Sequence, residues 1–182
     1  IRLMLPMVTN TKEIEHVFEH IDLIKNELEL DGVAYDKNMP IGAMIEVPSA
    51  AIAAPMFVEI LDFLSIGSND LIQYSNAVDR QDSEVSYLYE PLHFGVIKLI
   101  SLTVAAGIQG KKPVSICGEM ASDVRYTSLL LGLGLSELSV RPAVLFEIKE
   151  RIEGISVRDS KEMVERFLET ADPVILESLI AR

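Results

Sequence analysis

The chain has 182 residues, 49% of them hydrophobic, so it is long and apolar enough to fold as one domain with a sizeable core. A formal net charge of −12 argues against broad binding of nucleic acid or of anionic membrane surfaces. No apolar run approaches the roughly 20 residues of a membrane span, and the single cysteine excludes an internal disulfide framework. These features favour a cytoplasmic protein.

Short apolar runs and helical patterns alternate along the chain. The runs are rich in Ile, Leu, Val and Met, and they predict strands at residues 2–8, 41–47, 62–67, 113–117 and 137–140. Helical spacing and helix signals predict helices from Asn10 to Asp31-Gly32, at 49–58, from about Asp70, at 91–104, and near 122–132, 142–152, 157–169 and 172–181. This alternation is typical of β-α units that form a parallel sheet.

The first helical pattern carries a start signal and a motif that resembles a metal site. Asn10 followed by Glu13 is typical of a capping box at the start of a helix. His16, Glu19 and His20 match the H-x-x-E-H signature of one class of zinc proteases. At about 100° per residue, however, Glu19 points nearly opposite the apolar face of this helix. We therefore interpret the motif as part of a solvated helix face.

The number of β-α units limits the fold. A complete eight-stranded barrel typically needs about 250 residues, so this chain is too short for one. The sequence also begins within the pattern and without Met. We therefore expect residues 1–182 to be an α/β domain that forms the later part of a (β/α)8 TIM barrel, truncated at its N-terminus, with about five strands.

Carboxylates stand at the carboxyl ends of two predicted strands, which is where parallel sheets bind their ligands. Glu46 ends the second strand, and Asp70 follows the third strand after the turn Gly67-Ser68-Asn69. Two such oxygen ligands suit Mg²⁺, with water and substrate oxygens completing an octahedron. A metal would also allow this acidic chain to hold an anion. The structural alternative is that Glu46 is a hydrogen-bonded strand-end acid and Asp70 a helix N-cap.

Three further side chains are candidates for the same site. Asn69 can donate hydrogen bonds to a phosphate or a carboxylate. Arg80 lies in the polar segment 76–90, which we expect to lie over the strand ends, and its guanidinium either binds an oxyanion or is only solvated. Cys117 ends the fourth strand just before Gly118-Glu119, where it is either a buried small hydrophobe or a catalytic thiol.

Four segments, taken in their order and spacing, resemble one family. They are IGAMIEVPSA, DFLSIGSNDLIQYSNAVDR, SICGEMASD and LLLGLGLSELSV. Together they resemble the phosphoenolpyruvate (PEP)-binding domain of enzyme I of the bacterial sugar phosphotransferase system, and the likeness covers essentially the whole chain. The resemblance implies a (β/α)8 barrel of the phosphoenolpyruvate/pyruvate type, here without roughly its first three strands, and a homodimer.

The resemblance also implies a role for each candidate residue. Glu46 and Asp70 match Mg²⁺ ligands, and Asn69, Asp70 and Arg80 match residues that bind PEP. Cys117 matches the cysteine that donates a proton to the enolate as pyruvate forms. The implied activity is Mg²⁺-dependent transfer of a phosphoryl group from PEP to an enzyme histidine and on to the histidine phosphocarrier protein. The accepting histidine and the carrier-binding region would lie in domains outside residues 1–182.

The chain departs from the family pattern at two positions, and other interpretations stay open. Val47 stands where Thr is frequent, and Arg141 in SVRP stands where small residues more often follow the last strand, so the resemblance gives Arg141 no role.

A nitrogen-branch paralogue of enzyme I fits equally well. Pyruvate phosphate dikinase and phosphoenolpyruvate synthase share the acid after the second run and the SND turn. A further interpretation belongs to a different functional class: the chain is a dimerisation module without activity by itself.

Overall fold

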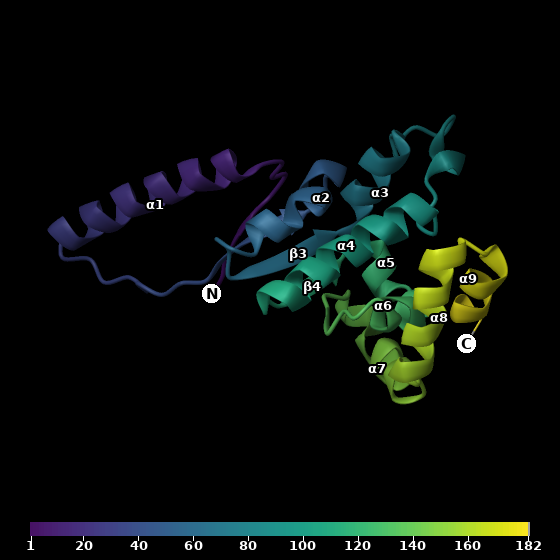
Figure 1. The fold of residues 1–182 in the computed structure, drawn as a ribbon. Coiled ribbons are helices and arrows are strands. Elements are labelled where there is room, and N and C mark those ends of the chain that lie inside the picture. Colours follow the sequence, from purple (N-terminus) through teal and green to yellow (C-terminus); the bar gives the residue numbers. More distant parts are fainter. Residues whose placement is uncertain (182) are drawn as a thin grey trace.

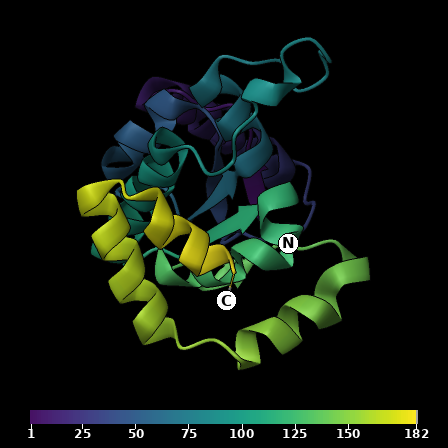
Figure 2. The ribbon, with the colours of Figure 1, turned by 90° about the vertical axis from the view of Figure 1, so that its right-hand side faces the viewer.

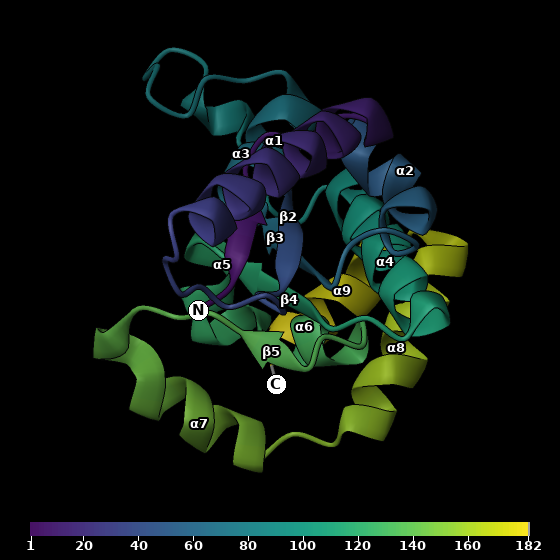
Figure 3. The same ribbon diagram turned by 90° about the vertical axis from the view of Figure 1, so that its left-hand side faces the viewer.

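The computed structural model describes residues 1–181, and its centre is a sheet of five parallel strands (Figures 1 and 3). Neighbouring strands in the sheet are consecutive in the sequence. The strands are β1 (Leu3–Leu5), β2 (Ile41–Ile45), β3 (Phe63–Gly67), β4 (Val114–Cys117) and β5 (Glu137–Leu138). The predicted α/β class with five strands is confirmed, although β1, β2 and β5 are shorter than the predicted 2–8, 41–47 and 137–140.

Helices connect the strands and then continue beyond the sheet, so that the last three gather at one end of the molecule (Figures 1 and 2). The α-helices are α1 (Thr11–Leu30), α2 (Pro48–Phe57), α3 (Ser68–Asn76), α4 (Phe94–Gly110), α5 (Glu119–Ser122), α6 (Thr127–Gly132), α7 (Leu145–Glu153), α8 (Val157–Thr170) and α9 (Pro173–Ile180). Three 3-10 turns are η1 (Ser86–Leu88), η2 (Val124–Tyr126) and η3 (Pro142–Val144).

Two helix predictions need correction. The single helix near 122–132 is wrong, because Asp123 is extended and its carboxylate accepts a hydrogen bond from the Arg125 N–H at 3.0 Å, which starts a new turn there. The helix expected at 91–104 begins only at Phe94, where the ring of His93 caps it, and it runs on to Gly110. Gly107 lies inside this helix and packs closely against β4, where a Cβ would collide with Val114.

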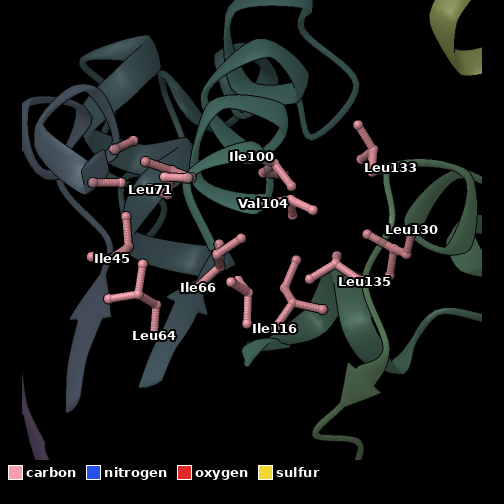
Figure 4. Close-up of a cluster of buried hydrophobic side chains, with 14 of the residues drawn as sticks. Ile45, Leu64, Ile66, Leu71, Ile100, Val104, Ile116, Leu130, Leu133 and Leu135 are labelled. Carbon is pink, nitrogen blue, oxygen red and sulfur yellow. The ribbon is translucent and has the colours of Figure 1, made fainter. Parts of the chain in front are cut away.

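One face of the sheet forms an apolar layer against the helices (Figure 4). Side chains alternate along a strand, so Ala43, Ile45, Leu64, Ile66 and Ile116 point the same way, and each is at most 1% exposed. Helices α2, α4 and α6 supply the facing side chains. Burying each large aliphatic side chain contributes about 1.5–3 kcal/mol relative to leaving it in water, so this layer fixes the sheet on its helices.

The opposite face of the sheet carries smaller and more polar side chains. Met44, Ser65 and Ser115 are partners across β2, β3 and β4, and the Ser115 hydroxyl donates a hydrogen bond to Ser65 Oγ at 3.0 Å. Gly42 makes room for an aromatic ring, because a Cβ at this position would lie 2.6 Å from Cδ2 of Phe63. In a closed barrel this face is the interior. The same alternation points the functional residues at the strand ends toward it.

Helix α1 lies to one side of the sheet (Figure 1). The predicted capping box is confirmed, since Asn10 Oδ1 accepts from the Glu13 N–H at 3.2 Å and the Glu13 carboxylate accepts from the Asn10 N–H at 3.2 Å. Ile14 near the start is fully buried, whereas Leu23 and Ile24 are 61% and 54% exposed. Only the first part of α1 is therefore anchored in the core. Among residues 1–181, no helix combines the length and the apolar character needed to cross a membrane.

Candidate active site

The register of the sheet aligns four residues at the carboxyl ends of its strands. Gly67 on β3 is paired with Cys117 on β4. One residue beyond the pair Ile45–Ile66, Glu46 lies next to Gly67, and one residue beyond Ile116–Leu138, Ser139 lies next to Cys117. We call Glu46, Gly67, Cys117 and Ser139 the strand-end row. A carboxylate, a gap where glycine carries no side chain, a thiol and a hydroxyl thus follow one another across the uncovered face.

Glu46 is a buried acid at one end of this row, with 4% of its surface exposed. Its Oε1 accepts a hydrogen bond from the Met7 N–H at 2.8 Å. Burial raises the pKa of Glu46 above the usual value, the Met7 N–H partly opposes this, and the negative charge of nearby Asp70 raises the pKa further. A cation between the two carboxylates would relieve both the burial cost and the repulsion.

Gly67 lets the Glu46 side chain pack directly against the main chain of β3. A Cβ on this residue would lie 2.7 Å from Glu46 Oε2 and 3.0 Å from Met44 Sδ, so any larger residue would displace the carboxylate. Gly67 is also the N-cap of α3, and no side chain caps this helix. Asp70 therefore lies in the first turn of α3 and is not its N-cap, which removes the structural alternative for that residue.

Hydrogen bonds fix the turn into α3 against the end of β4. The Ser68 hydroxyl donates to the Cys117 carbonyl at 2.7 Å, and the Glu119 N–H donates to Asn69 Oδ1 at 2.9 Å. Gly118, with φ of +93°, permits this close approach, because a Cβ there would lie 2.8 Å from Asn69 Oδ1. Since Oδ1 of Asn69 is an acceptor here, its Nδ2 group is oriented as the donor that can reach a ligand.

Cys117 is a half-buried thiol in the middle of the row, and its Sγ lies 3.5 Å from the Ile66 carbonyl oxygen. Burial raises the pKa of Cys117, a hydrogen bond with Ser65 opposes the shift, and the negative charges of Glu46 and Asp70 raise the pKa further. The thiol therefore stays protonated at neutral pH. This arrangement suits a proton donor better than a nucleophilic thiolate.

Arg80 lies in the exposed segment 77–93, which projects from the body beyond α3 (Figures 2 and 3). The return of this segment reaches the site, where the Tyr89 hydroxyl donates to the Asn69 carbonyl at 3.5 Å. Asn76 holds both neighbours of Tyr89, since its Nδ2 donates to the carbonyls of Leu88 and Glu90 at 3.3 Å each. The structure therefore places Tyr89 beside Asn69.

The groups that shift the pKa of Tyr89 include two candidate site residues, Asp70 and Arg80, so its hydroxyl lies near them. Burial raises the pKa of Tyr89, Glu119 raises it further, Arg80 lowers it, and Asp70 raises it. Sequence reasoning missed Tyr89, because a tyrosine in a polar segment gives no signal of function by itself. It also missed the gap at Gly67, which only the pairing of β2 with β3 reveals.

A cavity of about 460 Å³ opens beside the row. Its lining combines predicted residues with new ones: Asn69, Cys117, Gly118, Glu119, Ser122, Ser139, Val140 and Arg141. Glu46, Asp70 and Arg80 are not among the residues that line this cavity. The structure therefore brings Glu46, Asn69, Asp70 and Cys117 together at one end of the sheet, with Arg80 at the periphery.

Glu46 and Asp70 together fit a hard divalent cation that is shared with a ligand. Within residues 1–181, no group of three or more His, Cys, Asp or Glu side chains could hold a metal by itself. Mg²⁺ commonly binds through one or two carboxylates and takes its other oxygens from water and substrate, so the neighbouring carboxylates of Glu46 and Asp70 suit it.

The histidine motif of α1 has no such setting. His16 and Glu19 form an exposed pair at 3.5 Å, with side chains 71% and 74% exposed, and His20 Nδ1 lies 2.8 Å from the His16 carbonyl oxygen. The interpretation of this motif as a solvated helix face is confirmed.

Comparison with known sequences gives one family. Residues 1–157 match the family described as PEP-utilising enzyme, PEP-binding domain. Relatives named phosphoenolpyruvate-protein phosphotransferase include those of Cupriavidus necator, 42% identical over 95% of this chain, and Haemophilus influenzae, 38% identical over 98%. The relative of Bacillus subtilis is 36% identical over 92% of the chain. The chain spans 30%, 31% and 30% of these three proteins.

Solved structures show the same fold at low sequence identity. A citrate lyase from Burkholderia xenovorans superposes with a TM-score of 0.57 at 17% identity, over 99% of this chain and 54% of the lyase chain. The citrate lyase beta subunit of M. tuberculosis, solved with oxaloacetate and magnesium, gives 0.51 at 11% identity, over 81% of this chain and 59% of that one. These likenesses support a partial barrel.

Proposed function

The chain belongs to the PEP-binding domain family of PEP-utilising enzymes, and on this premise we propose that it forms the PEP site of a phosphoenolpyruvate-protein phosphotransferase, enzyme I of the bacterial phosphotransferase system. The observation that carries the proposal is the strand-end row, in which a buried carboxylate, a glycine and a protonated thiol lie side by side. Residues 1–182 would be one part of the barrel, and the accepting histidine would belong to another domain.

Glu46 and Asp70 would hold Mg²⁺, which supplies charge neutralisation on the transferring phosphoryl group. The Nδ2 group of Asn69 is free to donate to a substrate oxygen, because Oδ1 accepts from the Glu119 N–H. Arg80 would bind the phosphoryl group from the segment 77–93. This division keeps the charge-bearing groups near α3 and leaves the thiol for the carbon end of the substrate.

Cys117 would complete the reaction on the carbon side. Transfer breaks the P–O bond of PEP and forms a P–N bond at the accepting histidine, and the electron pair of the broken bond stays on the pyruvate enolate. The Cys117 Sγ–H then donates its proton to C3 of the enolate, which gives pyruvate, and the thiolate takes a proton back from solvent. The raised pKa of the thiol supports this role, since the group is protonated before the reaction.

The finer parts of the proposal rest on the family resemblance. They are Mg²⁺ dependence, the histidine phosphocarrier protein as acceptor, a homodimer, a role in sugar transport and a cytoplasmic setting. Two alternatives within the same class are a nitrogen-branch enzyme I and the barrel of a dikinase or synthase that also uses a nucleotide. A dimerisation module without activity is the alternative from another class.

The test is phosphorylation of the purified histidine phosphocarrier protein by the full-length protein, with Mg²⁺ and PEP but no nucleotide. We expect phosphocarrier formation matched by an equal amount of pyruvate. Formation only with a nucleotide would favour a dikinase or synthase, and no PEP turnover in any condition would favour the dimerisation module. The sugar-specific and nitrogen-specific phosphocarriers, compared at equal concentration, separate the two branches.

A further inference from the structure

Arg141 is held at the mouth of the barrel by its main chain. It follows β5 by three residues, and its N–H donates a hydrogen bond to Ser122 Oγ at 3.1 Å. Ser122 is itself only 5% exposed. The next residue, Pro142, restricts Arg141 to an extended backbone, observed at φ −64° and ψ 138°. The main chain of Arg141, from which its side chain extends, is therefore fixed relative to the end of α5.

This placement brings Arg141 into the cavity beside the strand-end row. Arg141 lines the same space of about 460 Å³ as Asn69 and Cys117, although it lies 24 residues after Cys117 in the sequence. Ser122 and Ser139, which also line the cavity, add hydroxyl groups. The lining on the β5 side is therefore polar and suited to an oxygen-rich ligand.

Within residues 1–181, no salt bridge balances the charge of Arg141. Arg125 pairs with Asp123 at 2.6 Å, and Arg158 pairs with Glu162 at 3.1 Å. No carboxylate oxygen within residues 1–181 comes within 4.0 Å of the Arg141 guanidinium, even though Glu119 lines the same cavity. In a chain with a net charge of −12, this leaves a cation available to an anionic ligand.

We propose that Arg141 binds an oxyanion of the substrate from the β5 side of the cavity, and so acts as a second substrate-binding arginine besides Arg80. This inference rests on the proposed function, because it takes PEP as the ligand. PEP carries two oxyanions, a carboxylate and a phosphoryl group, and a guanidinium binds either with two parallel hydrogen bonds. Arg141 would hold the substrate against Cys117 without itself taking part in bond making.

The test uses Arg141→Ala and Arg141→Lys in the full-length protein, with Arg158→Ala as the matched control on the surface of α8. We expect Arg141→Ala to raise KM for PEP roughly tenfold to a hundredfold, as loss of a charge-assisted contact does, with a much smaller change in kcat. Lys should restore part of the loss. An active protein in which Arg141→Ala leaves KM within about twofold of the wild type would overturn the inference.

Binding of two probes identifies the oxyanion and separates this inference from the proposed function. Oxalate presents carboxylates alone and inorganic phosphate presents a phosphoryl group alone, and calorimetry in the presence of Mg²⁺ measures both without turnover. Weaker oxalate binding in Arg141→Ala assigns the carboxylate, and weaker phosphate binding assigns the phosphoryl group. Unchanged affinity for both would refute the anion site. If Arg141→Ala weakens binding of oxalate or phosphate but the wild-type protein does not turn over PEP, the anion site stands and the proposed function is wrong.

Discussion

The strand-end row and the segment 77–93 contribute to the same site in different ways. Glu46, Gly67 and Cys117 are placed by strand pairing and by side chains that are buried or half-buried. Arg80 is exposed, and its backbone N–H donates to Gln73 Oε1 at 3.3 Å. The first group is preorganised by the sheet, and the second depends on a few hydrogen bonds of a projecting segment. Changes in the row should therefore lower kcat, whereas changes in the segment should mainly raise KM.

The largest effect is expected at the two candidate metal-binding carboxylates, Glu46 of the row and Asp70 of α3. Asp70→Asn and Glu46→Gln keep the side-chain size but remove the charge that would hold Mg²⁺, so PEP-dependent phosphorylation should fall roughly 1,000-fold, equivalent to about 4 kcal/mol. Steady-state assays of the full-length protein measure this. Glu162→Gln, on the exposed face of α8, is the control. Near-normal kcat in either Glu46→Gln or Asp70→Asn would mean that the substituted carboxylate does not act in the reaction.

The second effect separates proton transfer from phosphoryl transfer. Cys117→Ser replaces the thiol by a far weaker acid, so deuterium incorporation at C3 of pyruvate in D2O should slow roughly 100-fold, the usual contribution of a general acid. Phosphorylation of the enzyme histidine in a single turnover should change much less. If C3 labelling keeps its wild-type rate and stereochemistry, Cys117 has only a packing role.

The third effect tests the gap in the row. In Gly67→Ala the new Cβ would lie 2.7 Å from Glu46 Oε2, so the carboxylate must move, and we expect roughly tenfold lower affinity for Mg²⁺ and a loss of about 1–3 kcal/mol in stability. Calorimetry and denaturant unfolding measure the two quantities. Gly154→Ala is the matched control, because its Cβ would meet nothing closer than 3.7 Å. Equal Mg²⁺ affinity in both variants would show that the gap has no function.

The smallest effect is expected in the segment. Tyr89→Phe removes the hydroxyl that donates to the Asn69 carbonyl and lies near Arg80, which should raise KM for PEP about two- to tenfold and leave kcat nearly unchanged. Tyr87→Phe, on a side chain that is 79% exposed, is the control. A drop in kcat with unchanged KM would place Tyr89 in the chemistry of the row rather than in substrate binding.

The fold could be predicted from the sequence where local patterns determine the structure. Five apolar runs gave the strands, and the position of Glu46 directly after one of them placed it at the carboxyl end of the sheet. The Asn10 and Glu13 capping box was also recognisable, because it depends on residues only three apart. Boundaries failed where tertiary contacts decide: the helix expected at 91–104 runs on to Gly110, and Gly107 within it packs against Val114.

The parts of the site that depend on residues distant in sequence could not be predicted. The alignment of Gly67 with Glu46 and Cys117 follows from strand register, which no single segment encodes. The approach of Tyr89 to Asn69 depends on the path of segment 77–93, and the cavity beside Arg141 depends on the contact between Ser122 at the end of α5 and the segment after β5. Long-range packing, and not local propensity, determines these features.

The central claim is that Glu46 and Asp70 together hold a divalent cation beside Cys117. Its most direct measurement is binding of Mn²⁺, as a spectroscopic substitute for Mg²⁺, to the full-length protein in the presence of oxalate, followed by electron paramagnetic resonance. We predict one tightly bound ion for each chain in the wild type and in Glu162→Gln, and its loss in both Glu46→Gln and Asp70→Asn. Wild-type Mn²⁺ affinity in either of the last two variants would contradict the claim.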